Sequence, residues 1–169
     1  KNIDYVIADL EEDRAQAVTK QGKVIFAECD GGKKVIEVDK EWAKQLMDVS
    51  KIANVKKFVM LSSMGADKPE KADDIKEYWK VKHNADEHLK SSGLNYTIVR
   101  PGALTNENGT GRIKLEKKLN IQGEISRGDV AETLVRTLND DIANKATFEI
   151  LQGEKLISQA LDENAMSLA

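Results

Sequence analysis

The chain has 169 residues, a formal net charge of −3, 33% charged side chains and 40% hydrophobic side chains. These values are typical of one soluble globular domain that can bury a core without metal or disulfide cross-links. The mildly acidic balance and the 5% aromatic content give no basis for binding nucleic acid or an anionic membrane. The single cysteine, Cys29, excludes an internal disulfide and a cysteine-cluster zinc site. This cysteine content makes a reducing cytoplasm the expected location, and no apolar run approaches the ~18 residues of a membrane span.

The first quarter of the chain alternates between strand and helix patterns. Residues 3–10 predict a strand that ends near Asp9, and the acidic start of residues 11–18 predicts a short helix. Residues 23–27 predict a second strand, followed by a loop that contains Gly31 and Gly32. Apolar residues at helical spacing from Asp39 to Ala53 predict a second helix.

The stretch from Val55 to Leu94 organises the rest of the chain. Its apolar run, residues 58–61, has the length of a buried parallel strand and ends at two serines, Ser62 and Ser63. The helical pattern that follows places Tyr78 and Lys82 four residues apart, and so on one face of the helix.

The last part of the chain continues the alternation. Residues 94–102 predict a strand that Pro101 and Gly102 stop, followed by a long, mobile-looking loop over residues 103–112. Residues 112–119 are ambiguous between strand and helix. Residues 125–138 predict a helix with Ser126 as N-cap and Asp129 three residues later. A late strand over residues 146–151 and a last short helix over residues 158–166 complete the pattern.

Strand and helix alternation of this kind predicts an α/β fold with a doubly wound, mostly parallel sheet. Ligands of such sheets bind beyond the carboxyl ends of the strands. The polar or small residues at the predicted strand ends should therefore line one edge of the sheet. They are Asp9, Ala27 with Glu28, Ser62 with Ser63, Arg100 with Pro101, and the glycine-containing loop that follows.

Tyr78, Lys82 and one of the serines form a chemically sensible set. A tyrosine with a pKa near ~10 is a poor acid or base at neutral pH, and an ammonium one helical turn away favours its phenolate form. A serine hydroxyl can hold a substrate oxygen, so the set suits proton transfer to a carbonyl while a nicotinamide supplies hydride. Taken alone, the pair also fits a tyrosine on the core face and a solvated lysine.

Several stretches resemble the atypical short-chain dehydrogenase/reductase family of small, bacterial, NAD(P)H-binding proteins with a Rossmann-type fold. The matching stretches are "YVIADLEED", "VIFAECDGG", "KKFVMLSSMGAD", "YWKVKHNADEHLKSSGLNYTIVRPGALTNENGTG" and "GEISRGDVAETLV". The resemblance implies one Rossmann-like NAD(P)-binding domain over residues 1–169, incomplete at its N-terminus. It also implies an NAD- or NADP-dependent oxidoreductase or epimerase that acts on a small carbonyl or hydroxyl substrate.

The resemblance also assigns site residues. Ser63 or Ser62, Tyr78 and Lys82 would be catalytic, and Lys82 would also bind the nicotinamide ribose. Cofactor contacts would come from the residues that match the family at strand ends, namely Asp9, Leu10, Ala27, Pro101, Gly102, Ala103 and Leu104. Glu28 and Cys29 depart from the family, which places small residues there, and a carboxylate close to a pyrophosphate would repel it.

The family begins with a strand, a glycine-rich turn and a helix, and no G-x-x-G-x-x-G pattern occurs in these 169 residues. We therefore expect a fragment or a shortened version of a longer protein. Alternatively, the first predicted strand pairs directly with residues 24–27, or another chain supplies the pairing, as in a homodimer. A non-catalytic dinucleotide-sensing or interaction module, like the related nitrogen-regulation proteins, is the second functional hypothesis.

The remaining sequence patterns are weaker evidence of function. His83 and Glu87 have metal-ligand spacing, but no third ligand has convincing spacing and a solvated helix face is expected. Residues 61–66 lack the G-x-S-x-G pattern of a serine hydrolase. Cys29 is more simply a small buried residue than a reactive thiol. The lysine pairs at 33–34, 56–57 and 117–118 are expected on the solvated surface.

Overall fold

The structure, a computed structural model, describes residues 22–27, 35–71, 76–139 and 141–164, apart from the side chains of residues 35–42 and 71. Strands and helices alternate along the described residues up to residue 101, as the sequence predicts, and three further strands then come before the next helix. In chain order they are β1 (Lys23–Phe26), α2 (Val35–Ile52), β2 (Lys57–Leu61), the 3₁₀ turn η1 (Pro69–Lys71), α3 (Lys76–Ser91), β3 (Tyr96–Pro101), β4 (Ala103–Thr105), β5 (Arg112–Glu116), β6 (Glu124–Ser126), α4 (Arg127–Arg136), β7 (Ala146–Gln152), β8 (Lys155–Leu156) and α5 (Ile157–Asn164).

The described strands form one main sheet in the order β1-β2-β3-β7-β5-β8. Strands β1, β2, β3 and β7 are parallel to one another, and only β5 and β8 are added in antiparallel pairs. A second, small sheet pairs β4 with β6. The expected doubly wound, mostly parallel α/β fold is confirmed.

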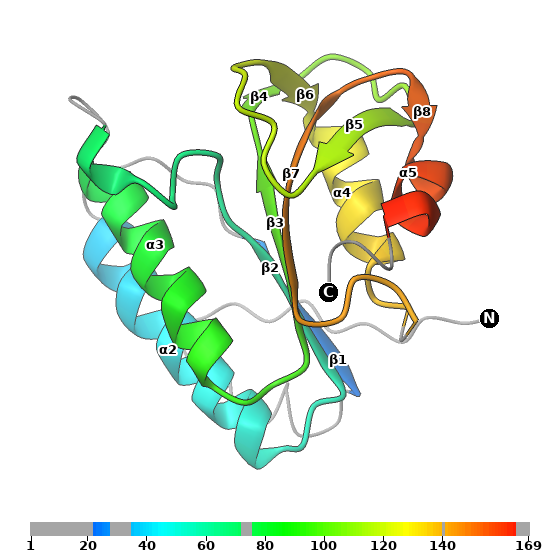
Figure 1. Cartoon of the computed structure of the whole chain (residues 1–169). Helices are drawn as coiled ribbons and strands as arrows, with labels where there is room; N and C mark the ends of the chain where they lie inside the picture. Colours follow the sequence, from blue (N-terminus) through cyan, green and yellow to red (C-terminus); the bar gives the residue numbers. More distant parts are fainter. Residues whose placement is uncertain (1–21, 28–34, 72–75, 140, 165–169) are drawn as a thin grey trace.

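Two hydrophobic cores lie on the two faces of the main sheet, each beneath one of the helix layers that Figure 1 shows. Helices α2 and α3 lie side by side over one face, where Met47, Phe58 and Leu89 are fully buried. Helices α4 and α5 cover the other face, over a core that includes Phe148 and Leu161. This placement follows from helices that alternate with strands and bury one apolar stripe each.

Local sequence signals explain several element boundaries. Ser126 is the N-cap of α4, and its side chain accepts a hydrogen bond from the backbone N–H of Asp129, as the capping pattern predicts. Strand β3 ends at Pro101, also as predicted. The ambiguous segment after it is the strand β5, in which buried and exposed residues alternate.

Two expectations about surface segments are wrong. The segment 103–112 is not a free loop throughout, because its first three residues form β4 and pair with β6. In each of the lysine pairs at 56–57 and 117–118, the first lysine is exposed and the second is not. Lys57 is fully buried, and its ammonium donates to the backbone carbonyl of Asn139 at 2.9 Å and to that of Ile142. A lysine with a polar partner for its head group can enter a core that its stem helps to fill.

Several expectations concern residues outside the described ranges. They are the strand over residues 3–10, the helix over residues 11–18, Asp9 and Leu10, Glu28 and Cys29, Gly31 and Gly32, and the lysine pair at 33–34. Among the helices that the structure describes, none combines the length and the apolar character that a bilayer crossing requires.

Candidate functional site

The carboxyl ends of the parallel strands bring the predicted strand-end residues to one edge of the main sheet. Pairing in register aligns Phe26 with Met60 and Leu61 with Val99, so β1, β2 and β3 end at the same edge of the sheet, with β3 extending furthest. Ala27 follows β1 and is exposed, whereas Gly102 follows β3 and is half-buried. Pro101 is buried, and Ala103 and Leu104 continue the chain into the small sheet.

Helix α3 returns from this edge to the opposite one, because it connects the parallel strands β2 and β3. Its first two turns carry Tyr78 and Lys82, and the ammonium nitrogen of Lys82 lies 5.6 Å from the centroid of the Tyr78 ring. That distance is within the range of a cation–π contact. Lys82 is only 5% exposed and Tyr78 is half-buried, so the alternative of a solvated lysine is wrong.

The two serines after β2 have different surroundings. Ser62 is buried, its hydroxyl donates to Oδ2 of Asp86 at 3.0 Å, and its backbone N–H donates to the carbonyl of Val99 at 2.8 Å. Ser63 is half-buried, and its hydroxyl donates to the neighbouring carbonyl of Met64 at 3.1 Å. Ser63 is therefore the hydroxyl that a ligand at this edge can reach.

An ion pair that sequence reasoning missed lies under the serines. Asp86, on α3, is fully buried, and its Oδ2 accepts hydrogen bonds from Nε of Arg100 at 2.9 Å and from a terminal guanidinium nitrogen of Arg100 at 2.6 Å. Burial raises the pKa of Asp86 above its usual value, and Arg100 and Ser62 limit that rise. One signal could have found Asp86: it continues the stripe of Tyr78 and Lys82 by one more turn.

A second buried carboxylate neighbours Arg100. Glu149 of β7 lies opposite Arg100 in the sheet and is fully buried. Its Oε1 accepts from the ammonium of Lys118 at 2.7 Å, and its Oε2 accepts from the backbone N–H of Leu119 at 2.8 Å. Lys118 also donates to Asp67 at 2.8 Å, in the turn after the two serines. Burial lowers the pKa of Lys118, but its hydrogen bonds to Asp67 and Glu149 outweigh burial and raise it overall.

The turn after the serines is fixed against α3 by a glycine and a histidine. Gly65 has φ +93°, and a Cβ atom there would lie 2.4 Å from the indole ring of Trp79. Nδ1 of His83 lies 2.9 Å from the carbonyl oxygen of Ala66. These contacts hold the turn that carries Ser63 against the helix that carries Tyr78 and Lys82.

The spacing of His83 and Glu87 does not assemble a metal site in the part of the chain that the structure describes, where no group of three potential ligands occurs. The expectation of a fully solvated helix face is wrong at His83, which is half-buried against Ala66. Glu87 is exposed and forms an ion pair with Lys90 at 2.8 Å.

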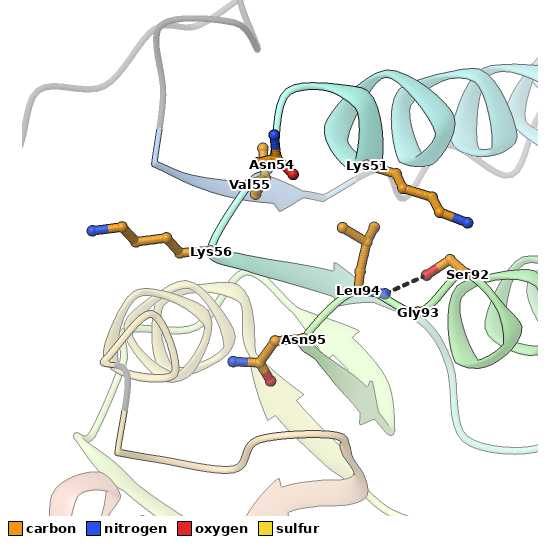
Figure 2. Close-up of a pocket in the computed structure, with 8 residues that line it drawn as sticks. All are labelled: Lys51, Asn54, Val55, Lys56, Ser92, Gly93, Leu94 and Asn95. Carbon is orange, nitrogen blue, oxygen red and sulfur yellow. Dashed lines mark hydrogen bonds between the residues drawn. The ribbon is translucent and has the colours of Figure 1, made fainter.

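A shallow hollow of about 340 Å³ lies at the opposite, amino-terminal edge of the sheet. Figure 2 shows the residues that line it. It is lined by the end of α2 and by the segments that lead into β2 and β3, including Lys51, Lys56 and Asn95. Ligands of doubly wound sheets bind at the carboxyl edge, so this hollow is separate from the candidate site.

The profile of the NAD(P)H-binding family matches residues 1–141. The chain belongs to this family. The matched residues include both serines, Tyr78, Lys82 and Arg100, whereas Glu149 lies beyond them.

The chain is also similar to individual relatives and solved structures of the same kind. The chain is 37% identical over 164 residues to the uncharacterized sugar epimerase YhfK of Bacillus subtilis, and the match covers 92% of this chain and 76% of that protein. A Bacillus halodurans protein provisionally named an NAD-dependent epimerase/dehydratase shares its fold with a TM-score of 0.86 and 33% identity, over 94% of this chain and 77% of that one. The oxidoreductase ylbE of Lactococcus lactis matches with a TM-score of 0.83 and 30% identity, over 97% and 78%.

Proposed function

We propose that this member of the NAD(P)H-binding family is an oxidoreductase or epimerase that acts on a small carbonyl or hydroxyl compound. The observation that carries the proposal is the buried ammonium of Lys82, 5.6 Å from the ring centroid of Tyr78, on the helix that follows Ser63. A buried cation beside a phenol favours the phenolate, which is the form that a tyrosine needs to accept a proton near neutral pH.

Each residue of the set has a distinct role in the proposal. Tyr78 gives a proton to the carbonyl oxygen of the substrate, or removes one from its hydroxyl. Lys82 stabilises the charge that the phenol then carries. Ser63 donates a hydrogen bond to the same substrate oxygen, because Ser62 already donates to Asp86.

The carboxyl edge of the sheet fits a nicotinamide dinucleotide. Ala27 is small and exposed at the end of β1, whereas the space beside the α-carbon of Gly102 is filled by Gly123 and Leu151. Backbone at the end of β1 can approach a planar ring closely. The bound dinucleotide would supply or accept the hydride. Pro101, Ala103 and Leu104 would form the strip of backbone beside the nicotinamide, and Asp9 and Leu10 would contact the adenine.

The names of similar proteins support this class of reaction. YhfK is named a sugar epimerase, and the Lactococcus lactis protein is named an oxidoreductase. Both kinds of reaction can proceed by hydride transfer between a nicotinamide and the carbon of a carbon–oxygen bond, with a protein group that transfers the proton on oxygen. The proposal therefore leaves the substrate as a small carbonyl or hydroxyl compound.

A titration and a turnover assay test the proposal together. NADH and NADPH fluorescence is followed as protein is added. Oxidation of the bound cofactor is then measured with a panel of small aldehydes and ketones, and epimer formation, which leaves no net change in the cofactor, is measured with a panel of sugars in the presence of NAD or NADP. Binding followed by turnover is expected. Absence of binding at millimolar cofactor would contradict the proposal. Binding without turnover on any compound of the panel would favour a non-catalytic dinucleotide-sensing module instead.

A further inference from the structure

Helix α3 carries two adjacent rows of side chains near its start. Tyr78 and Lys82 are four residues apart and form one row. Trp79 and His83, each one position later, form the next row around the helix. This second row contacts the turn that follows β2. One helix therefore carries both the pair proposed to transfer the proton and the side chains that meet the turn of the two serines.

Ser63 begins this turn and Ala66 ends it. The backbone N–H of Ala66 donates to the carbonyl of Ser63 at 3.2 Å, which closes a four-residue turn. Its third residue, Gly65, has φ +93°, and a type II turn requires a positive φ at that position. The backbone N–H of Met64 donates to the carbonyl of Pro101 at 3.0 Å and joins the turn to the end of β3. The turn is thus a closed unit in which Ser63 and Ala66 move together.

His83 holds the far end of this turn. Its Nδ1 lies 2.9 Å from the carbonyl oxygen of Ala66, and because a carbonyl can only accept, this nitrogen carries the proton and donates it. Ala66 is fully buried, so its carbonyl depends on a partner within the protein. The hydroxyl of Ser63, by contrast, donates to the adjacent carbonyl of Met64, and so local a bond does not fix the serine relative to α3.

We propose that His83 is a positioning residue that sets the place of the Ser63 hydroxyl relative to Tyr78 by holding the carbonyl of Ala66. The inference rests on the proposed function, in which Ser63 and Tyr78 act on the same substrate oxygen. Such an arrangement tolerates little displacement, because a shift of about 1 Å can cost about 100-fold in rate. Without the imidazole, the turn keeps its bond to β3 and loses this bond to the helix, so Ser63 shifts relative to the phenol.

Hydrogen exchange followed by NMR tests the positioning without cofactor or substrate. The amide hydrogen of Ala66 reports on closure of the turn, and that of Ser62, which donates to Val99, is the internal reference. His83→Ala should speed exchange at Ala66 about 10-fold, because a buried carbonyl loses its donor, and should leave Ser62 within about twofold. Alanine is the stronger helix former, so α3 is not weakened. His83→Asn, whose amide nitrogen can take the place of Nδ1, should restore slow exchange.

Turnover separates positioning of Ser63 from a structural role alone. His83→Ala should lower turnover about 10-fold. In the Ser63→Ala background the same substitution should change turnover less than about twofold, because the hydroxyl that it displaces is already absent. The matched control is His88→Ala, five positions along the same helix, where the imidazole faces Asp48 of α2 at 3.5 Å. That variant should change neither turnover nor exchange at Ala66.

Unchanged exchange at Ala66 in His83→Ala, or fast exchange that His83→Asn does not reverse, would overturn the inference. So would an equal loss of turnover with and without the Ser63 hydroxyl. If circular dichroism shows that His83→Ala does not fold, His83→Asn decides, since the inference predicts the exchange of the unmodified protein there and a 10-fold faster rate would overturn it. If the unmodified protein turns over none of the compounds, the proposed function fails, and the exchange rates alone decide whether His83 positions the turn.

Discussion

The ammonium of Lys118 lies 2.7 Å from the carboxylate of Glu149, a fully buried residue in the middle of the sheet. The same ammonium donates to Asp67, so one side chain joins β7 to the turn that follows the two serines. This bridge lies beside the Arg100–Asp86 pair and completes a group of alternating charges beneath the candidate site.

Replacement of Lys118 by Met should destabilise the protein by about 2 kcal/mol. Removal of one partner of a buried ion pair typically costs about 3–5 kcal/mol, and the cost is smaller here because the lysine is 35% exposed. Urea unfolding measures the change. Lys117→Met, at the exposed neighbouring position, should alter stability by less than about 0.5 kcal/mol. Equal losses in the two variants would contradict the role of the bridge.

Gly65→Ala should be more destabilising than Gly93→Ala. Both glycines have positive φ, +93° and +84°, so each alanine costs backbone strain of about 1 kcal/mol or more. Only at Gly65 would the new methyl group also meet Trp79, because nothing lies within 4 Å of the corresponding position at Gly93. Thermal unfolding of the two variants isolates the packing of the turn on α3. A smaller loss at Gly65 than at Gly93 would show that the turn is not held by that contact.

Asp129 should stabilise the folded protein at neutral pH and lose this effect at acidic pH. Burial raises its pKa, but hydrogen bonds from the backbone N–H groups of Thr110 and Gly111 outweigh burial, so the pKa lies below its usual value of 3.8. A carboxyl group whose folded-state pKa is depressed stabilises the fold above its unfolded pKa, and the contribution disappears as the pH falls through the folded pKa.

Asp129→Asn should therefore cost about 2 kcal/mol at neutral pH, and the difference from the unmodified protein should shrink as the pH falls below about 4. Urea unfolding across that range measures it. Asp162→Asn, at an exposed position on α5, should show neither effect. A difference that grows on acidification would contradict the assigned direction of the pKa.

Substitution of Ser62 should mainly lower stability, whereas substitution of Ser63 should mainly lower turnover. Ser62→Ala removes a donor to buried Asp86 and should cost about 1 kcal/mol of unfolding free energy. Ser63→Ala removes a hydroxyl that, among the residues the structure describes, donates to the adjacent carbonyl of Met64, and it should leave stability nearly unchanged while lowering turnover by about 100-fold. Chemical unfolding and cofactor oxidation, measured on both variants, give the comparison. The reverse pattern would assign the substrate contact to Ser62.

The sequence predicts the strands and helices of this fold well because their apolar residues recur at the period of each element. The buried run of β2 and the N-cap Ser126 are two examples. The position of the site follows as well, since parallel strands place Ser62, Ser63 and Gly102 at one edge.

The polar interior could not be predicted in the same way. Asp86 and Arg100 are fourteen positions apart, and each looks like an ordinary surface residue until the fold brings α3 onto β3. Lys57 and Lys118 look solvated for the same reason, because the carbonyl and carboxylate groups that receive them come from distant segments. A charged residue enters a core only when a partner is present, and single-sequence patterns do not show which partner that is.

The proposed reaction depends most on Tyr78, the group that transfers the proton. Its most direct test is the rate of cofactor oxidation by Tyr78→Phe, measured with the best compound of the panel and compared with Tyr96→Phe, a half-buried tyrosine of β3. General acid–base catalysis contributes about 10²–10⁴-fold, so the Tyr78 variant should lose at least about 100-fold in turnover and still bind the dinucleotide, while the Tyr96 variant retains its rate. Equal rates in the two variants would contradict the account.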